Sequence, residues 1–111
     1  MTLDDLKRID VLQTRSIAEA CNQEREGGGA ETLAYIIKCL NRFYSGDYGE
    51  IDREDTDANN SDLAEGYGHI LARYKQAHNL AGDIYIETHI DKDHTGDIEY
   101  NNTMIMYPAE R

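Results

Sequence analysis

Ser45 to Asn60, SGDYGEIDREDTDANN, separates a strongly amphipathic helical segment from the strand-like segments that follow it. This stretch is also the centre of the chain's negative charge, because Ser45 to Glu65 contains eight Asp and Glu residues against one Arg. Two glycines enclose a tyrosine in Gly46 to Glu50, which we interpret as a fixed turn between helix and sheet. We expect Asp52 to Asn60 to form an acidic loop that makes contacts with a partner.

The helix before this stretch has the clearest periodicity in the chain. Its apolar residues recur three, four, seven, ten and eleven positions after the first, which is the spacing of one helical face. They are Leu33, Ile36, Ile37, Leu40, Phe43 and Tyr44. Gly46 is a typical C-terminal stop, and the glycines from Gly27 to Gly29 break whatever comes before. We predict a helix over about residues 30–44 whose apolar stripe packs on a core.

Strand patterns fill the second half of the chain. Ile84 to Ile90 alternates apolar and polar residues, which predicts a half-buried strand, and Thr103 to Tyr107 predicts another. His69 to Tyr74 fits either a helical face or a strand. We favour the strand, because the two glycines just before it would each destabilise a helix by about 1 kcal/mol relative to Ala.

Two further segments are harder to assign. Residues 3–25 fit one helix or a short strand followed by a helix, since a β-branched, polar stretch interrupts the apolar stripe. Asn60 or Ser61 is expected to cap a short helix from Leu63 to Tyr67. We therefore predict a single α+β domain over residues 1–111, a small antiparallel sheet of three to four strands with one main amphipathic helix on one face.

Composition and charge narrow the classes of function. The formal net charge is −11, which argues against nucleic acid and anionic membranes as direct ligands, because both attract clustered Lys and Arg. A cation, a basic protein surface or solubility alone would suit this charge. We find no signal peptide and no membrane-spanning run. Cys21 and Cys39 have no CxxC partner and are expected to be reduced core thiols of a cytoplasmic protein.

The acidic stretch supplies the first candidate site. Its candidate binding residues are Asp47, Tyr48, Glu50, Asp52, Glu54, Asp55, Asp57, Asn59 and Asn60. Carboxylates are so numerous here that their presence alone does not indicate acid–base catalysis. A serine-nucleophile elbow and a reactive-cysteine motif are both absent from the sequence, so we favour a protein that is not an enzyme.

Asp91 to Asn102, DKDHTGDIEYNN, is the second candidate site and resembles a calcium loop. Its candidate ligands are Asp91, Asp93, Thr95, Asp97 and Glu99. The twelfth position of such a loop normally holds a bidentate Glu and is Asn102 here, which would weaken calcium binding. The alternative is a polar hairpin loop whose Asp and Gly residues satisfy turn geometry.

The four histidines, at positions 69, 78, 89 and 94, lack the spacing of a known zinc motif. His89 stands two residues after Glu87 on the predicted exposed face of a strand, close to His94, so these side chains are candidates for a common site. The alternative is that they are the solvent-facing polar residues of a sheet.

Four segments carry a family-like pattern, FYSGDYGEIDREDTDANN, LAEGYGHILARY, DIYIETHI and TMIMYPAER. The residues of the pattern are Phe43, Gly46, Asp47, Tyr48, Gly49 and Glu50, then Glu54, Asp55 and Asn59 or Asn60, then Gly68, Tyr74, Ile84 to Ile86, Thr103, Tyr107, Pro108 and Glu110. From Leu33 to Arg111 the chain resembles a family of short acidic proteins encoded on phages, plasmids and integrated elements of bacteria. The resemblance implies this genomic setting and strands after Gly68, and it implies no activity.

Three functions follow as expectations. The first is a non-enzymatic, acidic protein of a mobile element that binds a basic protein surface and mimics the charge of nucleic acid. The second is a protein that binds calcium or magnesium through the acidic loops. The third is a structural homodimer that pairs through an open edge of its sheet.

Overall fold

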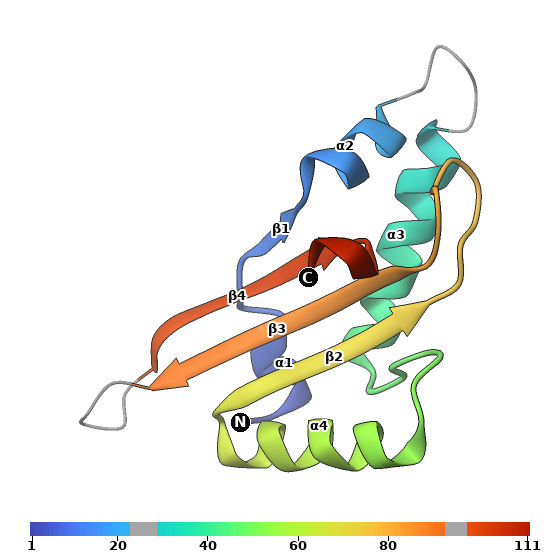
Figure 1. Ribbon diagram of the computed structural model, residues 1–111. Coiled ribbons are helices and arrows are strands. Elements are labelled where there is room, and N and C mark those ends of the chain that lie inside the picture. Colours follow the sequence, from blue (N-terminus) through green and yellow to red (C-terminus); the bar gives the residue numbers. More distant parts are fainter. Residues whose placement is uncertain (23–28, 93–97) are drawn as a thin grey trace.

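The computed structural model describes residues 1–22, 29–92 and 98–111. Its centre is a four-stranded sheet in the order β1-β4-β3-β2 (Figure 1). The strands are β1 (Val11–Gln13), β2 (Gly68–Tyr74), β3 (Ile84–Lys92) and β4 (Ile98–Met106). β2, β3 and β4 are antiparallel neighbours, whereas β1 runs parallel to β4. The α+β fold is confirmed, with a sheet that is mixed because of β1.

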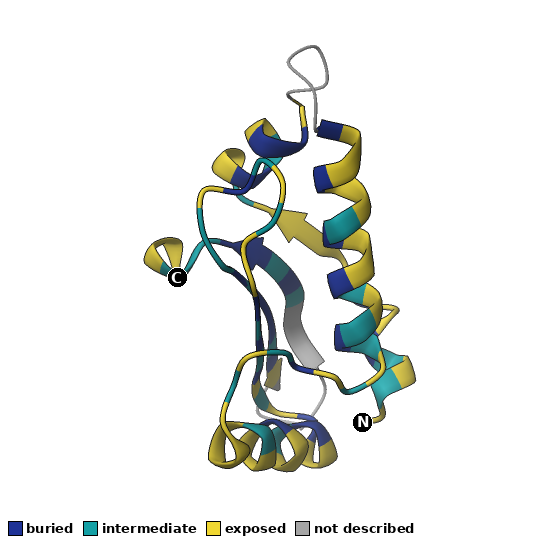
Figure 2. Cartoon of the chain, turned by 90° about the vertical axis from the view of Figure 1, so that its right-hand side faces the viewer, coloured by how far each residue is buried: buried dark blue, intermediate teal, exposed yellow. Residues whose placement is uncertain are grey.

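In the described residues, four α-helices and a final 3-10 helix surround this sheet. They are α1 (Leu3–Leu6), α2 (Arg15–Cys21), α3 (Gly29–Tyr44), α4 (Arg53–Glu65) and η2 (Pro108–Glu110). Figure 2 shows α3 along one face of the sheet and η2 on the opposite side, with α4 at the bottom of the picture. None of the helices in the described part of the chain is long and apolar enough to cross a membrane.

The core lies between α3 and the sheet. It contains Ile36, Cys39 and Phe43 of α3 together with Ile70, Ala72, Tyr74, Ile84, Ile86, Ile90 and Ile105 of the strands. The predicted helix over about 30–44 is confirmed, but its buried face is narrower than predicted. Leu33 and Ile37 remain 43% and 50% exposed, because only the positions nearest the sheet are covered.

The N-terminal segment takes the second of the two predicted forms, a short strand followed by a helix, with the single turn α1 before them. The backbone N–H of Thr2 donates to Asp5 at 2.7 Å, which satisfies a group at the start of α1. The hydroxyl of Thr14 accepts a hydrogen bond from the Ile17 N–H and so caps α2. The polar gap in the apolar stripe therefore corresponds to β1.

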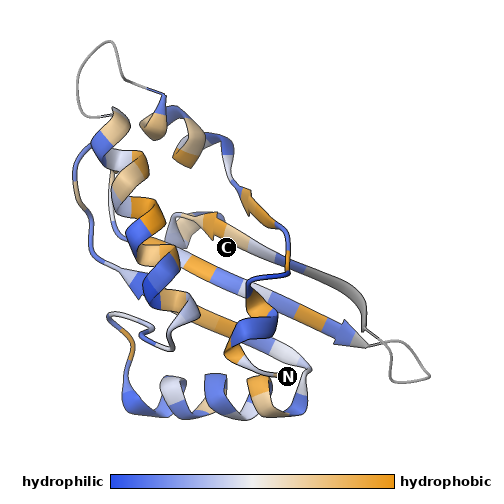
Figure 3. Cartoon of the chain, turned by 180° about the vertical axis from the view of Figure 1, so that it is seen from behind, coloured by the Kyte–Doolittle hydropathy of each residue, from blue (hydrophilic) through white to orange (hydrophobic). Residues whose placement is uncertain are grey.

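Asp52 to Asn60 was expected to be an acidic loop, and this prediction is wrong, because Arg53 to Asn60 belong to the helix α4. The side chain of Asp52 caps the helix by accepting from the Asp55 N–H at 2.7 Å, and Gly66 ends it in the left-handed conformation. The short helix was predicted to begin after Asn60 or Ser61, and this start is also wrong, because α4 begins at Arg53. α4 is polar over most of its length (Figure 3), so it shows no apolar periodicity in the sequence.

The turn before α4 is attached to the sheet. Gly46 and Gly49 have φ angles of 84° and 72°, which favour glycine. The Glu50 N–H donates to the carbonyl of Arg73 at 2.7 Å, and the Arg73 N–H donates to the carbonyl of Tyr48 at 3.1 Å. The turn thus extends the hydrogen bonding of the sheet beyond β2, as expected for a fixed element.

α4 closes the remainder of the β2 edge with its side chains. Asn59 forms two hydrogen bonds with Leu71, accepting from its N–H at 2.9 Å and donating to its carbonyl at 2.7 Å. Asp62 accepts from the His69 N–H at 3.0 Å. Together with the turn at Arg73, these contacts occupy outward backbone groups of His69, Leu71 and Arg73, which would otherwise be free to pair with another chain.

Two other predictions concern single residues and the second loop. Cys21 and Cys39 are both buried and unbridged, as expected for core thiols. Residues 93–97 of the calcium-like loop, and the side chain of Glu99, lie outside the described residues. Asp91 is exposed near the end of β3, and the loop connects strands rather than helices. The calcium site stays a prediction.

Candidate metal centre on the open face of the sheet

The sheet face opposite α3 brings together polar side chains from neighbouring strands. In the antiparallel register His69 lies beside His89, and His89 lies beside Asn102 on its other side. Glu87 lies between Leu71 and Met104 in the same way. Because alternate residues of a strand share a face, Glu87 and His89 point to the same side, and His69 joins them there.

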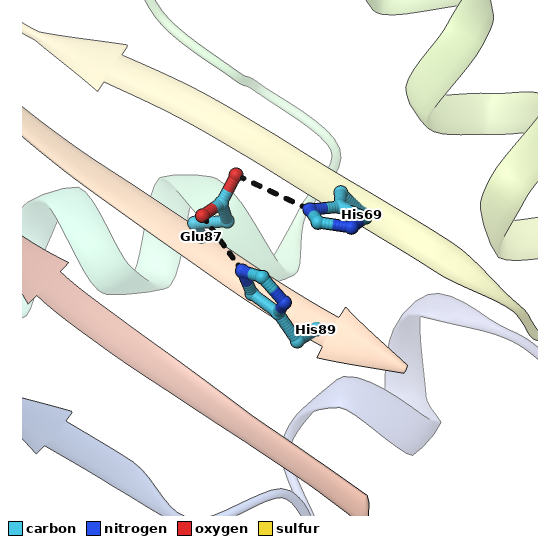
Figure 4. A group of neighbouring side chains, drawn as sticks. All are labelled: His69, Glu87 and His89. Carbon is cyan, nitrogen blue, oxygen red and sulfur yellow. Dashed lines mark hydrogen bonds and ion pairs between the residues drawn. The ribbon is translucent and has the colours of Figure 1, made fainter. Parts of the chain in front are cut away.

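Glu87 is the centre of the group. Its side chain is only 2% exposed, although it lies on the face without α3. His89 Nε2 donates to Glu87 Oε1 at 2.9 Å, and His69 Nδ1 lies 3.7 Å from Oε2. Figure 4 shows both imidazole rings turned towards the carboxylate. Arg111 donates a hydrogen bond from Nε to Oε2 at 3.0 Å, and its Nη2 lies 2.8 Å from the same oxygen as an ion pair.

These contacts keep the buried carboxyl ionised. Burial alone would raise the pKa of Glu87, but the hydrogen bonds from His89 and Arg111 outweigh it, so the pKa lies below its usual value. A buried anion without partners would be strongly destabilising. The site therefore presents a fixed negative charge to the two histidines.

The histidines are close together and partly accessible. Their ring centroids are 4.1 Å apart and the ring planes are inclined by 54°. The side chain of His69 is 53% exposed and that of His89 is 37% exposed. One nitrogen of each ring and one oxygen of Glu87 lie within 4.8 Å of one another. In the described part of the chain, these residues form the one such group of three.

A pocket of about 330 Å³ adjoins the group. Its lining contains His69, Glu87, His89, Asn102, Met104, Met106, Glu110 and Arg111. Met104 and Met106 contribute apolar surface to this lining, and the other residues contribute polar or charged groups. A ligand bound at the histidines would therefore have space beside it for a small molecule or water.

The C-terminal segment fixes Arg111 over this pocket. Glu110 Oε1 accepts from the hydroxyl of Thr14 at 3.0 Å and from the Tyr107 N–H at 2.9 Å. The guanidinium of Arg111 also lies 6.0 Å from the centre of the Tyr85 ring. The position of Arg111 is thus fixed by the contacts of the neighbouring Glu110 and by the contact of its own guanidinium with Tyr85.

The predicted binding residues of the acidic stretch do not form one site. Tyr48 and Asn59 are buried, and the side chain of Asn59 hydrogen-bonds to the backbone of β2. Asp47 pairs with Arg42 at 2.7 Å, Asp52 caps α4, and Glu50 lies 3.8 Å from Lys75. The remaining predicted residues, Glu54, Asp55, Asp57 and Asn60, are exposed on α4. About half of the predicted site is therefore architectural.

The association of His89 with Glu87 is confirmed, but the prediction that Glu87 is exposed is wrong. Its burial results from the covering side chains of His69, His89 and Arg111, which sequence spacing within one strand does not show. His69 was missed as a partner, and His94 lies outside the described residues. The register of the β2–β3 pair was the signal that would have found His69.

Comparison of the chain with family models, with curated proteins and with solved structures finds no match.

Proposed function

We propose that the protein binds a first-row transition-metal dication, with zinc as the reference ion, through His69, Glu87 and His89. The observation that carries this proposal is the buried, ionised carboxylate of Glu87 with an imidazole nitrogen on either side. Two imidazoles and one carboxylate form a ligand set found in zinc sites. Three protein ligands leave a fourth position for water or another ligand, on the side of the pocket.

The geometry requires one ligand to move. Ligand atoms on a tetrahedral zinc ion are about 3.3 Å apart, given bonds of about 2.0–2.1 Å. The widest separation in the group is larger, at up to 4.8 Å. His69 is the most exposed of the three side chains and is free to turn inward. The metal would take the place of the proton that His89 Nε2 donates to Glu87, and the neutral ring would then carry its proton on Nδ1.

Thermal unfolding with and without added zinc tests this proposal. An ion that binds only the folded state stabilises it and so raises the melting temperature. The gain in the free energy of unfolding is about 2.7 kcal/mol when the free ion is at a hundred times its Kd. We expect a clear increase for the wild type and its loss in His89→Gln and His69→Gln. His78→Asn is the matched control, since His78 is exposed outside the group. An absent increase in the wild type, or an equal increase in His89→Gln, would contradict the proposal.

A second function is favoured by a separate observation on α4. Glu54, Asp55 and Asp57 are exposed, and none of the ion pairs in the described part of the chain involves them. Carboxylates without counter-charges on one rigid helix attract a basic surface and accelerate association with it. This supports the role of an acidic interaction protein, in the mobile-element setting that the sequence resemblance implies.

Capture from host lysate at low and high salt tests this second role. The variant Glu54→Gln/Asp55→Asn/Asp57→Asn is expected to lose salt-sensitive partners that the wild type retains. Its matched control, Asp4→Asn/Asp10→Asn/Glu31→Gln, removes the same charge from exposed positions elsewhere. Equal capture by the two triple variants would show that α4 is not the contact surface.

A further inference from the structure

We propose that Arg111 determines which metal ions the site accepts, because it restricts Glu87 to coordination through a single oxygen. This inference rests on the proposed metal-binding function. It assigns to the site the class of small, four-coordinate ions of intermediate softness, represented by Zn²⁺ and Co²⁺. Hard ions that need many oxygen ligands, represented by Ca²⁺ and Mn²⁺, are expected to bind weakly at this site.

The two oxygens of Glu87 are used unequally. Oε2 accepts a hydrogen bond from Arg111 Nε at 3.0 Å and forms an ion pair with Arg111 Nη2 at 2.8 Å. Oε1 accepts one, from His89 Nε2 at 2.9 Å. The bond to His89 is the one that a metal on Nε2 replaces, once the ring carries its proton on Nδ1. Oε1 is consequently the oxygen open to a metal, while Oε2 stays with Arg111.

Arg111 is held in this position independently of any metal. Its guanidinium lies beside the Tyr85 ring, and the neighbouring Glu110 is bound to Thr14 and to the backbone of Tyr107. A metal that required both oxygens of Glu87 would have to displace the guanidinium and break its charge-assisted hydrogen bond and ion pair with Oε2. A metal that uses Oε1 alone leaves these contacts intact.

The other side chains of the pocket reinforce this selection. Ca²⁺ takes six to eight oxygens, often from bidentate carboxylates. Apart from Glu87, the one carboxylate in the pocket lining is Glu110, and its Oε1 already accepts two hydrogen bonds. Met104 and Met106 offer only thioether sulfur. Zinc needs only three protein ligands, which the two imidazoles and Oε1 supply, and water takes the fourth position.

Titration calorimetry of the wild type and of Arg111→Gln with Zn²⁺ and Mn²⁺ tests the inference. Without the guanidinium, Glu87 is free to bind through both oxygens, so Mn²⁺ should gain more affinity than Zn²⁺. We expect the ratio of the two dissociation constants to change by about tenfold, the lower end of the effects of residues that orient metal ligands. Arg73→Gln is the matched control, because Arg73 also pairs with a carboxylate and lies beside Tyr85.

The coordination number gives a second readout that a purely structural role would not change. Co²⁺ in a four-coordinate site absorbs visible light far more strongly than in a six-coordinate site. We expect strong absorption for the Co²⁺-loaded wild type and weaker absorption for Arg111→Gln. The melting temperatures of both proteins without metal show whether the variant is folded.

The outcomes separate the two proposals. Zinc binding that depends on His89, together with an unchanged Zn²⁺ to Mn²⁺ ratio and unchanged Co²⁺ absorption in Arg111→Gln, would overturn the role of Arg111 alone. Failure of the wild type to bind zinc would overturn the proposed metal site itself, and the role of Arg111 with it. A shifted ratio in Arg111→Gln but not in Arg73→Gln supports both.

Discussion

Gly49 is the residue at which the turn after α3 comes closest to the sheet. Its φ is 72°, and a Cβ atom added there would lie 2.0 Å from the carbonyl oxygen of Arg73. We expect Gly49→Ala to lower the free energy of unfolding by more than about 2 kcal/mol, through backbone strain and a displaced β2 edge. Urea unfolding measures this change. Gly82→Ala is the control, since nothing lies within 4 Å of its Cβ position, and equal midpoints would contradict the prediction.

Asp83 makes stability depend on acid pH. Its pKa is lowered by the hydrogen bond from the Gln76 N–H, at 2.8 Å, and then by Arg73. A carboxyl with a depressed folded-state pKa stabilises the protein above its unfolded pKa, and this contribution is lost as pH falls through the folded value. We expect the wild type to lose more stability than Asp83→Asn as the pH falls from about 5 to about 2.5. Urea midpoints at each pH, with Asp57→Asn as the exposed control, measure the difference. Parallel pH profiles for the wild type and Asp83→Asn would exclude this role.

Asn59 makes two of the hydrogen bonds that join α4 to β2. Asn59→Ala leaves the N–H and the carbonyl of Leu71 without their partner, and we expect a loss of about 2 kcal/mol of stability. The exposed strand edge should also promote self-association, which light scattering detects. Asn60→Ala is the control, because its side chain is exposed on the same helix. A monomeric Asn59→Ala protein of unchanged stability would show that the edge is closed by other means.

At the level of elements, periodicity predicted those that bury a continuous apolar face. α3 and β3 follow from it, whereas β4 extends further towards its start than the sequence indicated. The periodicity of β2 fitted either a helix or a strand, and the glycines before it favoured the strand. α4 was missed because only Asn59 and Leu63 are buried along it, so tertiary hydrogen bonds rather than an apolar stripe hold it. β1 has three exposed residues, and its place beside β4 depends on a long-range, parallel pairing.

The candidate site shows the same limit. Glu87 and His89 are two residues apart on one strand, and their proximity was therefore predictable. His69 joins them only through the β2–β3 register, and Arg111 only through the course of the chain after β4. Local spacing carries no information about such contacts, which form when distant segments pack.

At the scale of the whole molecule, a net charge of −11 should make stability rise with salt. Repulsion between exposed carboxylates opposes the compact state, and salt screens it over about 10 Å at 0.1 M. We expect the melting temperature to increase between low and moderate sodium chloride. The increase should be smaller in Glu54→Gln/Asp55→Asn/Asp57→Asn. A melting temperature that falls with salt would show that the ion pairs outweigh the repulsion.

The homodimer stays a prediction, and the structure limits its form. The β2 edge is occupied by α4 and the turn, so pairing between sheets would have to use the edge at β1. Light scattering at several concentrations measures the oligomeric state.

The closure of β2 also has a consequence for biosynthesis. α4 directly precedes β2, with only Gly66 and Tyr67 between them, and the turn comes before α4. Because a ribosome delivers the chain from its N-terminus, the groups that cover this strand have already emerged when β2 appears. The nascent strand then has one free side, and β3 is the next segment to arrive there.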